Sequence, residues 1–145
     1  METLLISACL MGYNCKYNGG NNALPEEVLA SLRRRWRLIP VCPEAAGGLP
    51  TPRTPSERRG DRVITRSGRD VTAEFRRGAE LAAKLAERFD AHLALLKSNS
   101  PSCGSGTIYD GSFSGRLVSG DGVTTEYLKN KNLIIFDNPS TFLTR

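Results

Sequence analysis

The stretch Leu4-Leu5-Ile6-Ser7-Ala8-Cys9-Leu10 is mainly apolar, and a second apolar stretch runs from Arg37 to Cys42. Runs of this kind predict short strands buried on both faces of a parallel sheet. Between them, Pro25-Glu26-Glu27 opens a predicted helix that ends at Arg35, because proline and acidic residues favour a first helical turn. This strand–helix–strand order is typical of a right-handed crossover unit.

The pattern of alternating helices and strands continues to the end of the chain. Asp70 is a predicted N-cap for the longest helix, from about Val71 to Asp90. A buried strand over Leu93–Lys97, a short helix over Thr124–Lys129 and a final strand over Leu133–Phe136 follow. The predicted fold class is therefore α/β with a mostly parallel sheet.

The segment from Pro43 to Arg69 is rich in proline, glycine and arginine. Its central part, residues 47–55, is incompatible with regular structure, because closely spaced prolines remove backbone donors and restrict their neighbours. Val63-Ile64-Thr65 is predicted to be a short strand in a hairpin. Long irregular segments inside small domains are usually functional.

Length and composition limit the class of protein. A chain of 145 residues predicts a single domain over residues 1–145. The apolar fraction of 39% excludes a disordered chain, and no apolar run reaches the roughly 20 residues needed to cross a bilayer. The apolar stretch from Leu4 to Met11 lacks a preceding basic region, so it does not resemble a signal peptide. We expect a cytoplasmic protein.

Three of the four cysteines share a placement relative to the predicted strands. Cys9, Cys42 and Cys103 each lie at, or a few residues beyond, the carboxyl end of a predicted parallel strand. Ligands bind at this edge of open α/β sheets, because the loops that leave the strands converge there. Thiolates from three loops are thus expected to meet in one pocket. The alternative is that these cysteines simply fill the core.

The chemistry of three converging thiolates remains open at this point. There is no Cys-x-x-Cys pair, which argues against a common closed zinc site and against a thioredoxin-like dithiol. Three cysteines on an iron–sulfur cluster leave one iron without a protein thiolate, and that iron is an open Lewis acid. Spacing alone does not separate zinc from a cluster. Cys15 is either a fourth ligand or, as we favour, a spare thiol in the Asn14–Gly20 loop.

Three motifs resemble one known family. They are residues 6–12 (ISACLMG), residues 42–53 (CPEAAGGLPTPR) and residues 96–104 (LKSNSPSCG). Together they are similar to the motifs of bacterial single-domain proteins related to thiouracil desulfidase, the TudS-like family. The resemblance extends from Leu4 to Phe136, and the motifs are specific in combination.

The resemblance implies a Rossmann-like three-layer α/β sandwich that carries an oxygen-sensitive 4Fe-4S cluster on Cys9, Cys42 and Cys103. It implies an iron–sulfur-dependent desulfidase that removes sulfur from a thiolated pyrimidine, of thiouracil or thiouridine type, by non-redox hydrolysis with release of sulfide. Glu44 and Ser100 match the family's carboxylate and serine. Glu44 is expected to act as general acid–base and Ser100 to orient the base or a water.

Blander interpretations of these residues stay open. Glu44 could be a loop carboxylate paired with Arg53, and Ser100 a turn residue before Pro101. Three rival functions also remain: a zinc-stabilised binding module, a redox or cluster-carrier protein that uses all four cysteines, and an RNA-binding accessory protein. The arginine-rich composition permits a tRNA partner, but no RNA-binding motif supports one. The oligomeric state is left open.

Overall fold

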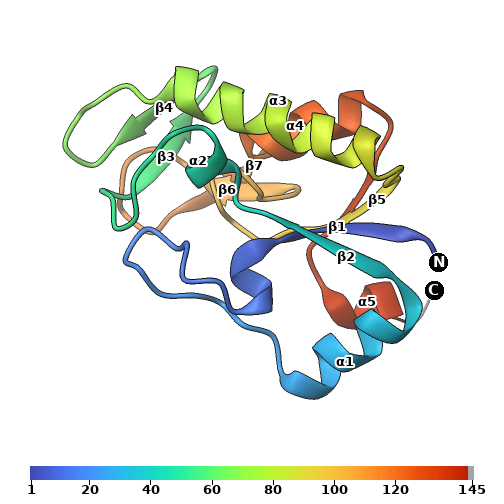
Figure 1. Cartoon of the computed structure of the whole chain (residues 1–145). Helices are drawn as coiled ribbons and strands as arrows, with labels where there is room; N and C mark the ends of the chain where they lie inside the picture. The colour runs from blue at the N-terminus through green and yellow to red at the C-terminus, as the bar shows by residue number, and fades with distance from the viewer. Residues whose placement is uncertain (144–145) are drawn as a thin grey trace.

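A four-stranded parallel sheet forms the centre of the computed structural model, which describes residues 1–143 (Figure 1). Its strands are β1 (Thr3–Ser7), β2 (Arg37–Val41), β5 (Leu93–Leu95) and β8 (Ile134–Phe136). They lie in the order β2-β1-β5-β8, and every neighbouring pair is parallel. The prediction of an α/β fold with a mostly parallel sheet is confirmed.

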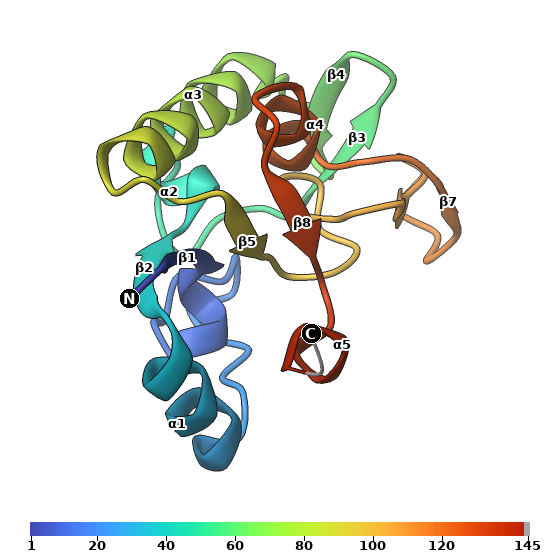
Figure 2. The ribbon, with the colours of Figure 1, turned by 90° about the vertical axis from the view of Figure 1, so that its right-hand side faces the viewer.

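Helices cover both faces of this sheet (Figure 2). One face carries α3 (Thr72–Arg88) and α4 (Val123–Asn130), and the other carries α1 (Glu26–Arg35) and α5 (Pro139–Leu143). The molecule is thus a three-layer sandwich, as the resemblance implied.

Side chains of β1 alternate between the two cores. Leu5 packs with Ala82 and Ala86 of α3, whereas Leu4 and Ile6 belong to the core against α1. Leu4, Leu5 and Ile6 are all fully buried. Each such side chain stabilises the fold by about 1.5–3 kcal/mol when it is withdrawn from water, so burial of β1 contributes strongly to the stability of the sheet.

The long helix α3 begins at Thr72, so the prediction of Asp70 as its N-cap is wrong. Asp70 stays extended because it forms an isolated bridge with Ile64. Val71 occupies the N-cap position, and its N–H donates to the carbonyl of Val63. The Asp70 carboxylate still accepts a hydrogen bond of 2.9 Å from the Thr72 N–H.

Several short elements departed from the sequence prediction. The first strand ends at Ser7, and residues up to Met11 form the 3-10 helix η1 (Ala8–Met11). A short helix, α2 (Pro43–Ala46), lies in the segment expected to be irregular. The expected hairpin strand is β4 (Arg62–Thr65), which pairs antiparallel with β3 (Ser56–Arg59). A second antiparallel pair, β6 (Thr107–Tyr109) and β7 (Leu117–Ser119), was not predicted.

Within residues 1–143, no helix combines the length and apolar character needed to span a membrane.

Candidate functional site

A pocket of about 510 Å³ lies at the carboxyl edge of the parallel sheet. The chain leaves β1 toward β2 on one side, and β5 lies on the other side of β1. This reversal of strand order is where ligands bind in open α/β sheets, because the loops diverge and leave a crevice. The pocket is therefore in the position that the topology favours for a ligand.

The structure brings the three predicted ligand cysteines to this pocket. Cys9 lies in η1 directly after β1, Cys42 joins β2 to α2, and Cys103 lies in the loop after β5. All three line the pocket, and none forms a disulfide. Sequence positions 33 and 61 residues apart thus meet at one surface. Cys103 is also a member of the buried core and Cys9 packs against the other core, so both cysteines lie at the boundary between core and pocket.

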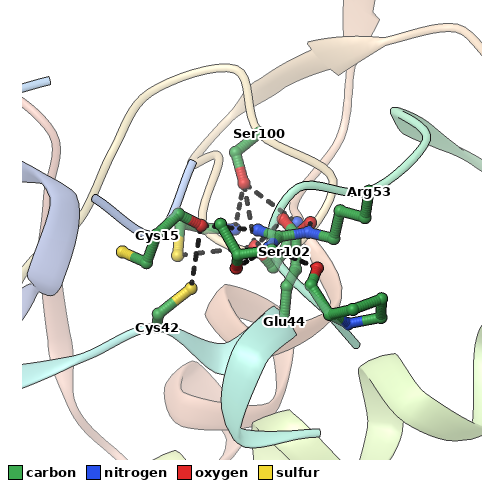
Figure 3. Close-up of polar contacts among 9 residues, drawn as sticks. Cys15, Cys42, Glu44, Arg53, Ser100 and Ser102 are labelled. Carbon is green, nitrogen blue, oxygen red and sulfur yellow. Dashed lines mark hydrogen bonds and ion pairs between the residues drawn. The ribbon is translucent and has the colours of Figure 1, made fainter. Parts of the chain in front are cut away.

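Neighbouring polar groups fix these sulfur atoms. The side-chain amide of Asn22 donates to Cys9 Sγ at 3.5 Å. The hydroxyl of Ser102 lies 3.6 Å from Cys103 Sγ. The Cys42 thiol points to the backbone carbonyl of Cys15 at 3.7 Å (Figure 3).

Burial and mutual proximity disfavour free thiolates here. Burial is the main cause that raises the pKa of the Cys103 thiol to about 12; the nearby Glu44 carboxylate and Cys9 act in the same direction, and hydrogen bonds with Ser7 and Ser102 oppose it. Burial also raises the pKa of Cys9, and Cys42 adds to that shift. Thiols crowded in this way are stabilised as thiolates when a cationic group binds among them. The donor set fits an iron–sulfur centre, whose protein ligands are thiolates.

The sulfur positions differ from those of a single-ion site. Among residues 1–143, no group of three or more His, Cys, Asp or Glu side chains is arranged to hold one metal ion. A cluster does not need such a group, since each thiolate binds a different iron.

Cys15 also lines the pocket. Burial and the neighbouring Cys42 raise the pKa of its thiol to about 12. Its backbone carbonyl accepts hydrogen bonds from Cys42 Sγ and, at 2.8 Å, from Arg53 (Figure 3). The loop that carries Cys15 is therefore part of the pocket wall.

Glu44 projects into the site from the first turn of α2. Its Oε1 forms an ion pair with Arg53 at 3.1 Å, and its Oε2 accepts a hydrogen bond from Ser102 at 3.0 Å. The pairing with Arg53 that we considered as the blander alternative is present. It does not remove Glu44 from the pocket, because the same carboxylate lines it.

Ser100 and Ser102 form the opposite side of this polar network (Figure 3). Their hydroxyl oxygens lie 2.9 Å apart. Ser100 Oγ accepts the backbone N–H groups of Ser102 and Cys103 at 3.1 and 2.9 Å. The turn that we considered as the blander alternative is present at residues 101–103, directly after Ser100, and Ser100 also lines the pocket. Sequence reasoning missed Ser102, although its position beside Cys103 was an available signal.

Close packing of α2 on α3 holds Cys42 and Glu44 in place. A Cβ at Gly78 would lie 1.9 Å from the carbonyl oxygen of Pro43. A Cβ at Gly47 would lie 2.0 Å from the carbonyl oxygen of Glu74. Only glycine permits this approach on either side, so the position of α2 depends on both.

An aromatic and cationic wall completes the pocket, and sequence reasoning missed it. Tyr109 and Phe113 line the pocket, and the Arg66 guanidinium lies 5.5 Å from the centre of the Phe113 ring. Phe113 has a left-handed backbone, with φ of 57°. Its N–H donates to Glu57, which also accepts the N–H of Gly111. This wall offers flat apolar surface to a planar ring.

Comparison with known proteins agrees with this geometry. The sequence model of the family described as 2-thiouracil desulfurase matches residues 4–139. A solved structure of the [4Fe-4S]-dependent thiouracil desulfidase TudS superimposes with a TM-score of 0.93 at 46% identity, covering 99% of this chain and 96% of that one. The uncharacterized protein YbbK of Bacillus subtilis (strain 168) is 40% identical, with 87% of this chain and 89% of that protein covered.

The fold and pocket are thus those of an α/β enzyme with its site at the carboxyl edge of the sheet. The chain belongs to the 2-thiouracil desulfurase family.

Proposed function

We propose that this protein is a 4Fe-4S-dependent desulfidase that hydrolyses a thiolated pyrimidine without net redox change and releases sulfide. The observation that carries the proposal is the meeting of Cys9, Cys42 and Cys103 in one pocket with Glu44 and Ser100. The similarity to a solved [4Fe-4S]-dependent thiouracil desulfidase supports it.

Cys9, Cys42 and Cys103 would hold the cluster, because each follows a different strand and all line the same pocket. When bound, the cluster supplies a Lewis-acidic iron without a protein thiolate, suited to a soft sulfur atom of the substrate. Cys15 remains outside this set in our proposal, and its backbone carbonyl serves to position Arg53 and Cys42.

Glu44 is proposed to take a proton from the attacking water. In the balanced reaction, water adds its oxygen to the carbon of the C=S group, the C–S bond breaks, and a C=O group forms with hydrogen sulfide as the second product. No electron is gained or lost. General acid–base help of this kind typically contributes 10²–10⁴-fold to the rate. The ion pair with Arg53 holds the carboxylate in place for the transfer.

Ser100 is proposed to orient the base or the water from the opposite side of the pocket. Tyr109 and Phe113 would flank the planar ring and exclude bulk water from the reacting carbon. We further propose a single domain over residues 1–145, acting in the reducing cytoplasm, where free thiols persist.

The test is anaerobic reconstitution of the protein with iron and sulfide, followed by sulfide-release assays on thiolated uracils, thiouridines and thiolated nucleotides. We expect a brown protein with visible absorbance of a 4Fe-4S cluster and release of one sulfide per oxygenated pyrimidine formed. A colourless protein that binds zinc instead, or a brown protein inactive on every thiolated pyrimidine, would overturn the proposal.

A further inference from the structure

Three oxygen atoms lie in a row beside the pocket and connect its two proposed functional side chains. Ser100 Oγ is 2.9 Å from Ser102 Oγ, and Ser102 Oγ is 3.0 Å from Glu44 Oε2. Ser102 is the middle member, and it is only 2% exposed. Water therefore has little access to replace its hydroxyl in this row.

Counting protons gives the row a direction. Ser100 Oγ already accepts two backbone N–H groups, from Ser102 and Cys103. A hydroxyl has two acceptor positions and one proton, so Ser100 is left as the donor toward Ser102. Ser102 in turn donates to Glu44, since an ionised carboxylate is acceptor-only. The direction is Ser100 to Ser102 to Glu44.

A second acceptor competes for the Ser102 proton and is the weaker one. Cys103 Sγ lies at 3.6 Å, whereas the carboxylate oxygen lies at 3.0 Å. The proton of Ser102 is thus assigned to Glu44.

The backbone of Ser102 is held independently of this row. Its carbonyl accepts the N–H groups of Thr124 and Thr125 at the start of α4, at 2.9 and 3.2 Å. Gly122 packs so closely that a Cβ there would lie 2.4 Å from the carbonyl carbon of Ser102. The hydroxyl is therefore presented from a fixed backbone.

We propose that Ser102 is a positioning residue for the proposed reaction. Its hydroxyl donates to Glu44 Oε2 and accepts from Ser100 Oγ, and it thereby holds the carboxylate in the orientation from which Glu44 takes a proton of the attacking water. Ser102 itself keeps its proton in this proposal. This proposal rests on the proposed desulfidase function.

The test compares Ser102→Ala, Glu44→Gln and the double variant, each reconstituted anaerobically. Ser31→Ala is the matched control, because Ser31 lies on α1 and contacts only Arg34 among the side-chain hydrogen bonds described. For Ser102→Ala we expect unchanged cluster absorbance, an unchanged calorimetric Kd for the product uracil, and a kcat lower by about 10- to 100-fold at similar KM.

The double variant separates positioning from general loss of structure. If Ser102 acts through Glu44, Ser102→Ala lowers kcat by less than about twofold in the Glu44→Gln background. Three results would overturn this role of Ser102 while wild-type activity stands. They are losses in kcat that add up in the double variant, a rise in the Kd for uracil as large as the fall in kcat, and a near-native kcat in Ser102→Ala. If the wild-type protein has no desulfidase activity, the proposed function itself fails and this role of Ser102 fails with it.

Discussion

Arg53 Nε lies 3.1 Å from Glu44 Oε1, and the two side chains are only 7% and 16% exposed. The same guanidinium donates to the backbone carbonyls of Cys15 and Pro50 and to the Thr51 hydroxyl. One arginine thus links the carboxylate of α2 to two loops of the pocket. A buried fork of this kind fixes geometry that an ammonium group does not reproduce.

Arg53→Lys should therefore destabilise the protein and lower its activity, because lysine cannot span these acceptors. We expect a loss of about 1–3 kcal/mol in the free energy of unfolding, measured by urea titration. Arg62→Lys is the control, since the Arg62–Asp70 pair is 75% and 44% exposed and should contribute little. Equal effects of the two variants would contradict a special role for Arg53.

Alanine at Cys9, Cys42 or Cys103 should abolish the brown chromophore after reconstitution, since each removes one proposed cluster ligand. Cys15→Ala should keep it. Visible absorbance and iron content measure the outcome, and far-UV circular dichroism checks the fold of each variant. Loss of the chromophore in Cys15→Ala would make Cys15 a ligand and favour a closed, non-catalytic cluster.

Glu44→Gln should retain the cluster but lose turnover by about 10²–10⁴-fold, because the amide cannot accept the proton of water. Glu80→Gln on α3 is the control for removal of one negative charge, and it should leave turnover unchanged. Sulfide release under saturating substrate is the measurement. Full activity in Glu44→Gln would remove Glu44 from the mechanism.

Gly78→Ala should destabilise the protein by about 1–3 kcal/mol, because the new Cβ meets the Pro43 carbonyl at 1.9 Å and forces α2 away. The usual effect of this change inside a helix is the opposite, a gain of roughly 0.5–1 kcal/mol. Thermal unfolding measures whether Gly78→Ala lowers or raises the stability. Cluster content should fall as well, since Cys42 and Glu44 flank Pro43; a stabilised variant would refute the close packing.

Acid should weaken the start of α3 through Asp70. The Thr72 hydroxyl and N–H donate to its carboxylate and lower the pKa of Asp70 below its ordinary value of 3.8. Because the pKa is lower in the folded state, the ionised Asp70 carboxylate stabilises the folded protein above about pH 4 to 5. This stabilisation is lost as the pH falls through the pKa of the folded state. Asp70→Ala should thus be less stable than wild type at pH 7, and the difference in the free energy of unfolding should narrow as the pH falls below 3.8. Asp61→Ala is the exposed control, and a gap that persists in acid would argue against the titration.

Local pattern was enough to define the main elements of the sheet and its covering helices. The apolar run from Leu4 predicted β1, in which Leu4, Leu5 and Ile6 are fully buried. In the predicted helices, apolar residues at helical spacing are buried: Leu29 and Leu32 in α1, and Phe75, Ala79 and Ala82 in α3. Hydrophobic periodicity reports burial directly, so these elements follow from the sequence.

The sequence analysis did not predict short elements that are stabilised by contacts with other parts of the fold. The helix α2 has four residues, and it is held by contact with Gly78 of α3. The pair β6 and β7 has three residues in each strand, and Glu57 of β3 ties the loop between them. Such elements are too short to show a period, so tertiary contacts decide them.

The sequence alone determined the class of fold. It also determined that Cys9, Cys42 and Cys103 lie at one edge of the sheet, because parallel strands place their carboxyl ends together. Only the tertiary structure decided how the polar groups between them connect. Ser102 lies 58 positions from Glu44 yet donates to it at 3.0 Å. Hydrogen-bond partners so far apart in the chain depend on how α2, α3 and α4 pack, and no local pattern encodes that packing.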